Sequence, residues 1–517
     1  MSDRPFRENV TVVPARGTAD DRTTAQDGPD RNAAEQDRDR WKALAVCLAV
    51  GFMTLLDVSI VNVALPSIES SLGAGASQIQ WIVAGYTLAF GLVLVPAGRF
   101  GDLYSRRTVF LIGLTGFVLT SAAAGLVQSA TALAVVRLVQ GFTAGLVNPQ
   151  VVALIQELFS GAERGRAFAA FGTTVGLSTA VGPLLGGGIL ALFGEENGWR
   201  GVFLVNVPIG VVLLPLAWKW LPRKGKKPTG PLNLDVVGLL LLGSAVLLLM
   251  LPFVLTTGSG GSPARWALLA PGALLFTAFV LWERRLGRLD RHPVVPGELV
   301  RTGSFSAGAG VGIAYFAGFT GIFLVVTLYL QSGLGFSPLQ AGLVQTPFAL
   351  ASAVTSQVGG RLVSRLGRWI VVIGLVVVAV GLLAADLVAA AVQGTGGAVA
   401  LSACLAVAGA GGGLVISPNQ TLTLADVPRS VAGVAGGVLQ TGQRVGSAIG
   451  VAAVTAIFFS GIATGSAAGG GAPDGSAYGE ALSHGLRVSL GLVVLALLIA
   501  VLDLRRRSGR GGLASDG

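Results

Sequence analysis

The stretch Leu55-Leu-Asp-Val-Ser-Ile-Val-Asn-Val-Ala-Leu-Pro66 lies late in the first long apolar run of the chain and carries a single carboxylate, Asp57. A run of this length and composition predicts a helix that crosses a membrane. A charge inside the hydrocarbon layer is costly, so an acid at such a depth is a candidate functional residue. The alternative is an acid close enough to the end of its helix to reach water without any further role.

The composition places the chain in a membrane. Of its 517 residues, 52% are hydrophobic and 12% are charged, whereas a soluble protein carries about 25% charged residues. The 76 glycines agree with this assignment, because small residues let membrane helices approach closely. Cys47 and Cys404 lie far apart in apolar runs and predict neither a disulfide framework nor a metal site. We therefore expect an all-α polytopic membrane protein.

The formal net charge of +10 does not indicate nucleic-acid binding, because the charged residues fall in short segments between the apolar runs. The sequence contains no Walker-type phosphate loop, no His-Glu-x-x-His and no Gly-x-Ser-x-Gly motif. We expect no enzymatic activity, no cofactor and no nucleotide as partner. Any uphill transport would then draw on an ion gradient.

Fourteen apolar runs are long enough to cross a bilayer, at about 20 residues each. They cover approximately residues 42–65, 79–97, 108–127, 131–155, 167–192, 202–221, 235–255, 266–283, 304–330, 340–358, 369–391, 398–424, 431–459 and 486–503. Arginine and lysine concentrate in alternate loops, and this bias predicts that both termini lie in the cytoplasm. The chain should therefore be a multi-pass protein of the plasma membrane with an even number of spans.

The sequence also repeats itself. Gly98-Arg-Phe-Gly-Asp-Leu-Tyr-Ser-Arg-Arg107, between spans two and three, resembles Gly360-Arg-Leu-Val-Ser-Arg-Leu-Gly-Arg-Trp369, between spans ten and eleven. Parallel repeats of six spans are typical of transporters that rock about a central site. We expect a disordered cytoplasmic tail over 1–40, a six-helix bundle over 41–221, a linker with two extra transmembrane helices over 222–303, a second six-helix bundle over 304–503 and a cytoplasmic tail over 504–517.

The estimated depth of each charged residue in the membrane selects three of them. At about 1.5 Å per residue, Asp57 and Arg137 each lie about 12 Å below the outer face, and Arg444 lies about 20 Å from the inner end of its span. These similar levels suggest a coupled set. The alternative for each arginine is a structural ion pair or a bond to backbone carbonyls. Asp386 lies nearer the outer end of its span, where we expect it to reach water.

The faces of these helices agree only in part. Asp57 and Asn62 project in directions about 140–160° apart, so Asn62 is expected in helix packing or in the cavity. In span thirteen, glycines at 442, 446 and 450 form a close-packing stripe, and Gln440 and Arg444 lie on the other side. Arg444 therefore points away from the tight contact.

Small residues at helical spacing mark span five. Gly172, Gly176, Thr179, Pro183 and Gly187 share one face, and Gly182 with Gly186 gives a second. Such spacing favours close helix contacts that slide or bend.

The loop that starts at Gly98 places Asp102 beside Arg106 and Arg107 at a helix junction. A carboxylate near a helix N-terminus is favoured by the helix dipole, so this loop is a candidate conformational latch. The alternative is a basic loop that only sets topology.

Taken in order, these motifs resemble the major facilitator superfamily, specifically its fourteen-span drug/proton antiporters of the EmrB/QacA type. The likeness covers about residues 41–505. It rests on 56–66 in span one, Gly98–Arg107, Arg137-Leu-Val-Gln-Gly141 in span four, Gly182-Pro-Leu-Leu-Gly-Gly187 in span five, 199–210, 330–343 and 440–450.

The resemblance implies the major facilitator fold and proton-driven export of amphipathic compounds. It implies that Asp57 is a protonation or substrate-charge site and that Arg137 modulates its proton. Gly182, Pro183, Gly186 and Gly187 would form the antiporter motif. Candidates for the substrate cavity are Asn62, Gln140, Asn148, Gln440 and Arg444.

Three functions remain open at this point. The first is a proton-coupled exporter of small hydrophobic compounds, acting as a monomer in the lipid bilayer. The second keeps the fold and exports an endogenous metabolite, peptide or lipid precursor. The third is a non-transporting membrane receptor or scaffold, which no attached soluble domain supports.

Overall fold

The computed structural model describes residues 28–194, 196–223, 235–255, 263–289, 291, 293–391, 394–469 and 475–512. Within these ranges all regular structure is helical. The α-helices are α1 (Gly28–Leu72), α2 (Ala76–Leu103), α3 (Arg106–Leu126), α4 (Ala130–Leu158), α5 (Gly161–Phe193), α6 (Gly198–Leu204), α7 (Asn206–Trp220), α8 (Val236–Val254), α9 (Leu269–Arg288), α10 (Gly297–Arg301), α11 (Gly303–Leu328), α12 (Pro338–Leu366), α13 (Trp369–Ala391), α14 (Gly394–Thr423), α15 (Ala432–Gly469) and α16 (Gly475–Gly512). Residues 28–40 and 504–512, expected in the tails, are thus helical, and the rest of both predicted tails lies outside the described residues.

Thirteen helical segments in the described ranges are long and apolar enough to cross a membrane, with α6 and α7 together forming one of them. The tenth predicted span corresponds to α12, which is 29 residues long but more polar than the others. Its start is set locally, because Ser337 and Gln340 form a reciprocal capping box with Pro338 at the first helical position. The all-α membrane fold expected from the sequence is confirmed.

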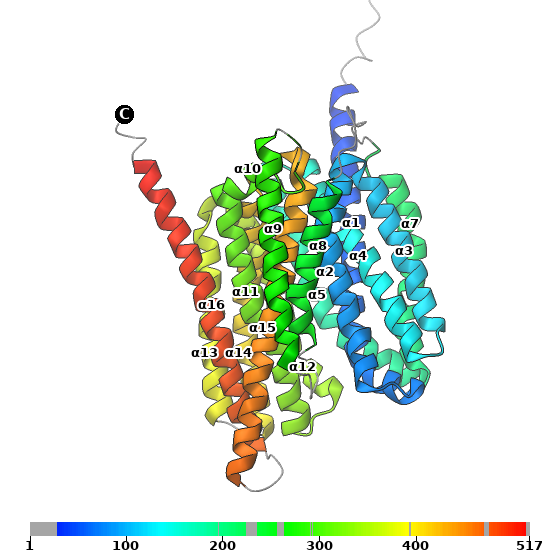
Figure 1. Cartoon of the computed structure of the whole chain (residues 1–517), viewed down its shortest axis with the longest axis vertical. Helices are drawn as coiled ribbons and strands as arrows, with labels where there is room; N and C mark the ends of the chain where they lie inside the picture. Colours follow the sequence, from blue (N-terminus) through cyan, green and yellow to red (C-terminus); the bar gives the residue numbers. More distant parts are fainter. Residues whose placement is uncertain are drawn as a thin grey trace, which may run out of the picture.

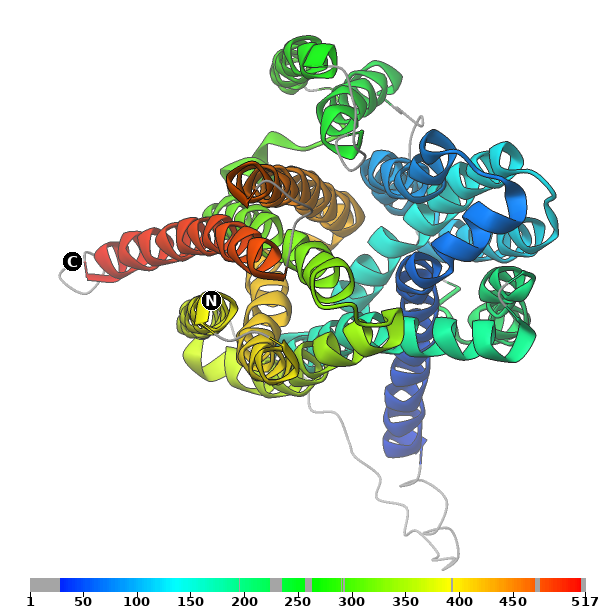
Figure 2. The same cartoon turned by 90° about the horizontal axis from the view of Figure 1, so that it is seen from below.

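The long helices form two bundles that lie side by side (Figure 2). One large apolar core contains Phe110 and Phe168 in the first half of the chain, and another contains Leu375 and Phe458 in the second half. The halves meet along two seams, α2 against α15 and α5 against α12. In each seam the second long helix of one half contacts the fifth of the other, so the internal repeat of the sequence is matched by the packing.

The inserted helices α8 and α9 pack on one another at the edge of the molecule, beside the α2/α15 seam (Figure 2). Leu242, Val246 and Phe279 of this pair share a core with Leu88 and Val95 of α2. Asp235 fixes the pair at one end, because its carboxylate caps α8 at Gly238 N and accepts a hydrogen bond from Trp282 Nε1 at 2.9 Å. The pair therefore covers one seam between the halves.

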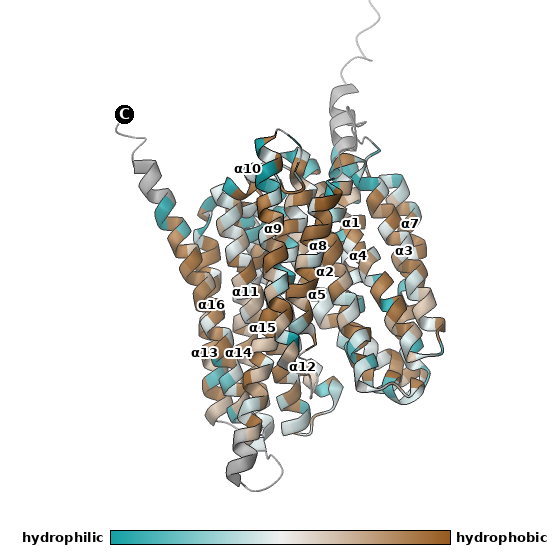
Figure 3. Ribbon diagram, viewed as in Figure 1, coloured by the Kyte–Doolittle hydropathy of each residue, from teal (hydrophilic) through white to brown (hydrophobic). Residues whose placement is uncertain are grey.

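The start of α1 and the end of α16 lie at the same end of the molecule (Figure 1). Polar residues gather at both ends of the helices, and a broad apolar band lies between them (Figure 3). An even number of membrane crossings gives this arrangement.

Candidate functional site

Asp57 lies fully buried in α1, and both of its carboxylate oxygens have partners. Arg137 Nη1 of α4 lies 2.5 Å from Asp57 Oδ2. Gln140 Nε2 and Asn206 Nδ2 donate to Asp57 Oδ1 at 3.1 and 2.9 Å. Desolvated charges of this kind are stable only when they are paired and hydrogen-bonded. The water-exposed alternative for Asp57 is therefore wrong.

The guanidinium of Arg137 connects this pair to α2. Arg137 Nε donates to the backbone oxygen of Ile82 at 3.2 Å, and Arg137 Cζ lies 4.2 Å from the ring centroid of Tyr86. Tyr86 in turn donates to the backbone oxygen of Thr54 in α1, at 3.2 Å. Both structural interpretations of Arg137, an ion pair and a bond to a carbonyl, are realised at once. The charge pair thus ties together α1, α2 and α4.

Asn206 and Ser121, which the sequence reasoning did not select as site residues, complete the cluster. Asn206 Nδ2 and Gln140 Nε2 both donate to Ser121 Oγ, at 3.0 and 3.2 Å, and Ser121 donates to the backbone oxygen of Phe203. Both residues are fully buried. A lone asparagine two residues before a proline in the sixth apolar run was the available signal. The cluster is therefore a closed polar core shared by α1, α3, α4 and α7.

Removing Asn206 is expected to weaken this core. Asn206→Ala should lower the free energy of unfolding by about 1–3 kcal/mol, because a buried carboxylate loses one of its donors. Thermal and denaturant unfolding in detergent micelles measures the change. Asn62→Ala is the control, because Asn62 is exposed and should change stability by less than about 0.5 kcal/mol. Equal effects of the two substitutions would contradict the assignment.

The predicted cavity residues are not all in one place. Gln140 lies inside the buried cluster rather than on an open surface, whereas Asn62 of α1 is exposed. Asn148 of α4 is buried, and its Nδ2 has no hydrogen-bond partner within the described residues. Gln440 of α15 is also buried, and its Nε2 likewise has no hydrogen-bond partner within the described residues. The structure therefore separates Gln140 from the other four candidates.

Arg444 forms no direct ion pair with Asp57 among the described residues, and it approaches the Asp57–Arg137 pair only through the stacked rings of Tyr86 and Phe90. Its guanidinium lies over the ring of Phe90 in α2, with Cζ 4.7 Å from the centroid. The glycines on the other side of α15 pack on α11, where a Cβ at Gly442 would lie 3.0 Å from Ile313 Cγ1. Arg444 therefore points away from the tight contact, as the glycine spacing predicted.

The glycines of α5 meet two different helices. A Cβ at Gly182 would overlap the side chain of Ser59 in α1, and one at Gly186 would lie 3.1 Å from Ile60 Cγ1. On the other face, Gly176 and Pro183 lie against α12, where a Cβ at Gly176 would be 3.0 Å from Ala349 O. Helix α5 thus touches both halves through small residues.

Substituting Gly182 should therefore block transport. Gly182→Val must push α5 away from α1, so we expect less than about one tenth of the wild-type rate at normal expression. Gly188→Val is the matched control, because no atom outside its own helix lies within 4 Å of its Cβ position. Dye efflux from cells that express each variant at equal level tests this. Wild-type transport by Gly182→Val would show that the close contact is dispensable.

At the end of the molecule where α1 starts, Asp102 joins the two halves. Its oxygens accept hydrogen bonds from the backbone N–H groups of Gly433 and Val434, at 3.0 and 2.9 Å, in the first turn of α15. Arg106 Nη2 lies 2.9 Å from Asp102 Oδ1 and also donates to the backbone oxygen of Arg429. The helix dipole and the free N–H groups both favour a carboxylate there.

Glycines permit this contact. A Cβ at Gly98 would overlap the backbone oxygen of Gly433 in the α2/α15 seam. Gly360, which occupies the same place in the repeat, approaches Gly165 of α5, where a Cβ on Gly165 would lie 2.8 Å from Gly360 O. Both seams are therefore tightly closed at this end. Arg107 does not join the contact, since it bonds to Trp218 of α7 instead.

Asp386 is not exposed to water, so that expectation is wrong. The Asp386 side chain is buried in α13, accepts a hydrogen bond from Ser483 and lies 3.2 Å from Arg487 Nε. Both partners belong to α16, whose position relative to α13 the sequence does not reveal. Asp386 therefore serves a helix contact within the second half.

Two related helical bundles, closed at one end and holding an ion pair within the apolar band, define a class of membrane transporters. The family model described as Major Facilitator Superfamily matches residues 47–451. The chain belongs to the major facilitator superfamily.

Several curated relatives are similar over most of their length. A probable actinorhodin transporter of Streptomyces coelicolor is 37% identical, covering 88% of this chain and 78% of the relative. A tetracenomycin C resistance and export protein of Streptomyces glaucescens is 32% identical, covering 81% and 76%. A puromycin resistance protein of Streptomyces alboniger is 33% identical, covering 87% and 86%.

Two solved structures share the fold at 16% identity. The human organic anion transporter MFSD10 (TETRAN) has a TM-score of 0.61 and covers 89% of this chain and 99% of its own. The proton:xylose symporter XylE has a TM-score of 0.61, with 90% and 95% covered.

Proposed function

We propose that this protein exports small amphipathic or hydrophobic compounds, antibiotics among them, in exchange for protons. The observation that carries the proposal is the buried Asp57–Arg137 pair, a titratable carboxylate held inside the membrane at the junction of several helices. The relatives named for antibiotic resistance and export support the class of cargo. The proposal also assigns the chain to the fourteen-span drug/proton antiporters, with α12 as a crossing helix.

The partners of Asp57 support proton coupling. A proton that binds the carboxylate removes its negative charge and weakens the attraction to Arg137. Arg137 then retains Ile82 O and the Tyr86 ring, both in α2. Protonation therefore shifts the arginine from α1 toward α2, and α2 is one of the helices that form the seam with α15. A change of charge at Asp57 is thus transmitted through α2 to the contact between the two halves.

In alternating access, the seams between the two halves are closed at one end of the molecule while they are open at the other. With the basic loops in the cytoplasm, the contact of Asp102 with α15 closes the cytoplasmic side in this structure. Opening requires that contact to break while α5 bends or slides on α1 and α12. We place the substrate between the halves, near Asn62, Gln440 and Arg444. The bundles 41–221 and 304–503 would move as units, and 222–303 would follow the seam.

The proposal is tested with purified protein in liposomes. An imposed pH gradient should drive accumulation of a lipophilic dye and of selected antibiotics in wild-type vesicles, and a protonophore should abolish it. Transport that persists after collapse of the gradient would overturn proton coupling.

The exporter of an endogenous compound remains the second candidate, because the three Streptomyces relatives are each named for a single compound. Metabolite profiling of a deletion strain beside a drug-susceptibility panel separates the two. Accumulation of one metabolite with unchanged drug susceptibility would favour the second candidate.

A further inference from the structure

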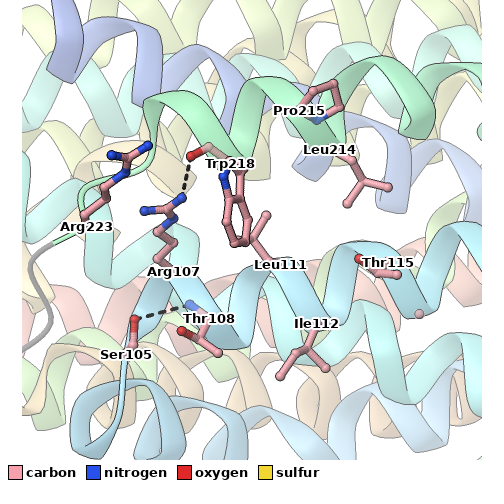
Figure 4. Close-up of a pocket in the computed structure, with 11 residues that line it drawn as sticks. Ser105, Arg107, Thr108, Leu111, Ile112, Thr115, Leu214, Pro215, Trp218 and Arg223 are labelled. Carbon is pink, nitrogen blue, oxygen red and sulfur yellow. Dashed lines mark hydrogen bonds between the residues drawn. The ribbon is translucent and has the colours of Figure 1, made fainter.

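A groove of about 960 Å³ lies between α3 and α7 (Figure 4), two helices at the outer edge of the first half (Figure 1). None of its lining residues belongs to the Asp57 cluster. The groove is lined by one face of α3 and its N-cap, from Ser105 to Gly116, and by Leu214, Pro215, Trp218 and Arg223. At about 1.5 Å per residue, the α3 wall is about 16 Å long. This length matches one leaflet of a bilayer whose hydrocarbon layer is about 30 Å thick.

One end of the groove is polar and positively charged. Arg107 and Arg223 lie on the same side of it, next to the N-terminus of α3 at Ser105 (Figure 4). Within the described part of the chain, neither guanidinium forms an ion pair with a carboxylate. Arg107 Nη2 donates to the backbone oxygen of Trp218 at 2.5 Å, which fixes its position and leaves its charge uncompensated. The first turn of α3 adds the positive end of its helix dipole.

The rest of the groove is apolar. Leu111, Ile112, Leu214 and Pro215 line it beyond the arginines (Figure 4). The side chain of Ile112 is 59% exposed and that of Trp218 is 63% exposed, although both lie on membrane-spanning helices. Trp218 stands beside the charged end, with its ring centroid 4.8 Å from Arg107 Cζ. Tryptophan favours the interface between headgroups and hydrocarbon.

We propose that this groove binds one anionic phospholipid from the leaflet at the end of the molecule where α1 starts. The phosphate would lie between Arg107 and Arg223, and one acyl chain would lie along Leu111, Ile112 and Leu214. Two arginines without carboxylate partners attract a phosphate group. The apolar wall is as long as one leaflet, so the ligand that carries the phosphate must also carry an acyl chain. A zwitterionic lipid fills the same wall and presents a phosphate, but its ammonium group adds a positive charge, so the net charge of the site is not reduced.

The site also bears on the contact between the halves. Arg107 follows Arg106, which bonds to Asp102 and to the backbone oxygen of Arg429. A lipid that holds Arg107 against Trp218 fixes the first turn of α3 and thereby the direction of the neighbouring arginine. Anionic lipid should therefore stabilise the closed end of the molecule. This inference does not depend on the nature of the cargo.

The test compares phosphatidylglycerol with phosphatidylcholine of identical acyl chains. Native mass spectrometry of the full chain should show one phosphatidylglycerol retained at least fivefold more tightly than phosphatidylcholine. Arg107→Gln/Arg223→Gln should remove this preference. Arg505→Gln/Arg506→Gln is the matched control, since it removes the same charge at the same end of the molecule from exposed positions in α16. The control should keep the preference.

Two further measurements keep the test decisive. Arg223→Gln alone leaves the bond between Arg107 and Trp218 intact and should reduce the preference at least twofold in a normally folded protein. Soluble glycerol phosphate at millimolar concentration should not raise the melting temperature, whereas phosphatidylglycerol should. Equal losses in the groove and control variants, or full protection by glycerol phosphate, would overturn the assignment of a lipid site.

Discussion

Asp57→Asn is expected to abolish efflux driven by a pH gradient and to leave downhill exchange of substrate across the membrane intact. Asparagine keeps the shape of the side chain, and its single amide oxygen can still accept a hydrogen bond from Arg137 or from Asn206, but it cannot carry the proton. The carboxylate of Asp57 is the acidic partner of Arg137. We expect gradient-driven transport in liposomes to fall at least a hundredfold and substrate exchange without a gradient to change less than threefold.

Loss of folding would give a similar fall and must be separated from loss of coupling. Removing one member of a buried ion pair costs about 3–5 kcal/mol, because the remaining charge is uncompensated. The double variant Asp57→Asn/Arg137→Gln removes both charges and should recover much of the stability without recovering coupling. Asp386→Asn changes another buried carboxylate, paired with Arg487, and should retain the response to the gradient. Full coupled transport by Asp57→Asn would overturn the role of this residue.

Asp102→Asn is expected to open the end of the molecule that this structure holds closed. The change removes the charge from the N-terminus of α15 and directs an amide donor toward a backbone donor. Hydrogen bonds to a charged group contribute about 1.5–3 kcal/mol each. Losing about 2 kcal/mol moves a conformational equilibrium about thirtyfold, since about 1.4 kcal/mol corresponds to a factor of ten.

Distances between spin labels measure this shift. Tyr104 in the α2–α3 turn and Ser430 before α15 are exposed and lie on opposite sides of the seam. In a background without cysteine, labels at these positions should show a new population at longer distance in Asp102→Asn. Glu157→Gln is the control, because Glu157 binds Arg106 within the first half and makes no bond to α15 among the described residues. An unchanged distance distribution in Asp102→Asn would contradict the latch.

Local features of the sequence anticipated much of the fold. The length of the apolar runs predicted the crossing helices, and the loop repeat predicted two related halves. The small-residue spacing of α5 predicted two contact faces, which meet α1 and α12. These predictions succeed because burial in hydrocarbon and close packing depend on the residues of a single helix. They required no knowledge of how the helices were placed.

Predictions that depended on distance between helices were less secure. Similar depth suggested that Arg444 belongs with Asp57, yet Arg444 lies over Phe90 of α2, one helical turn from the Tyr86 ring that contacts Arg137. Depth fixes one coordinate and leaves the direction around the helix axis open. Asp386 was expected at the water surface for the same reason, because its partners on α16 are about 100 residues away in the chain.

The sequence by itself determined that the chain crosses the membrane many times, that its halves are related, and that Asp57 lies within the apolar layer. Only the tertiary structure decided what surrounds that carboxylate. Asn206 comes from a helix distant in sequence and reaches Asp57 because the first bundle packs α7 beside α1. Ser121 joins the cluster through Asn206, because α3 packs on α7. A buried charge must find its partners in space, so its neighbours are set by helix packing rather than by order along the chain.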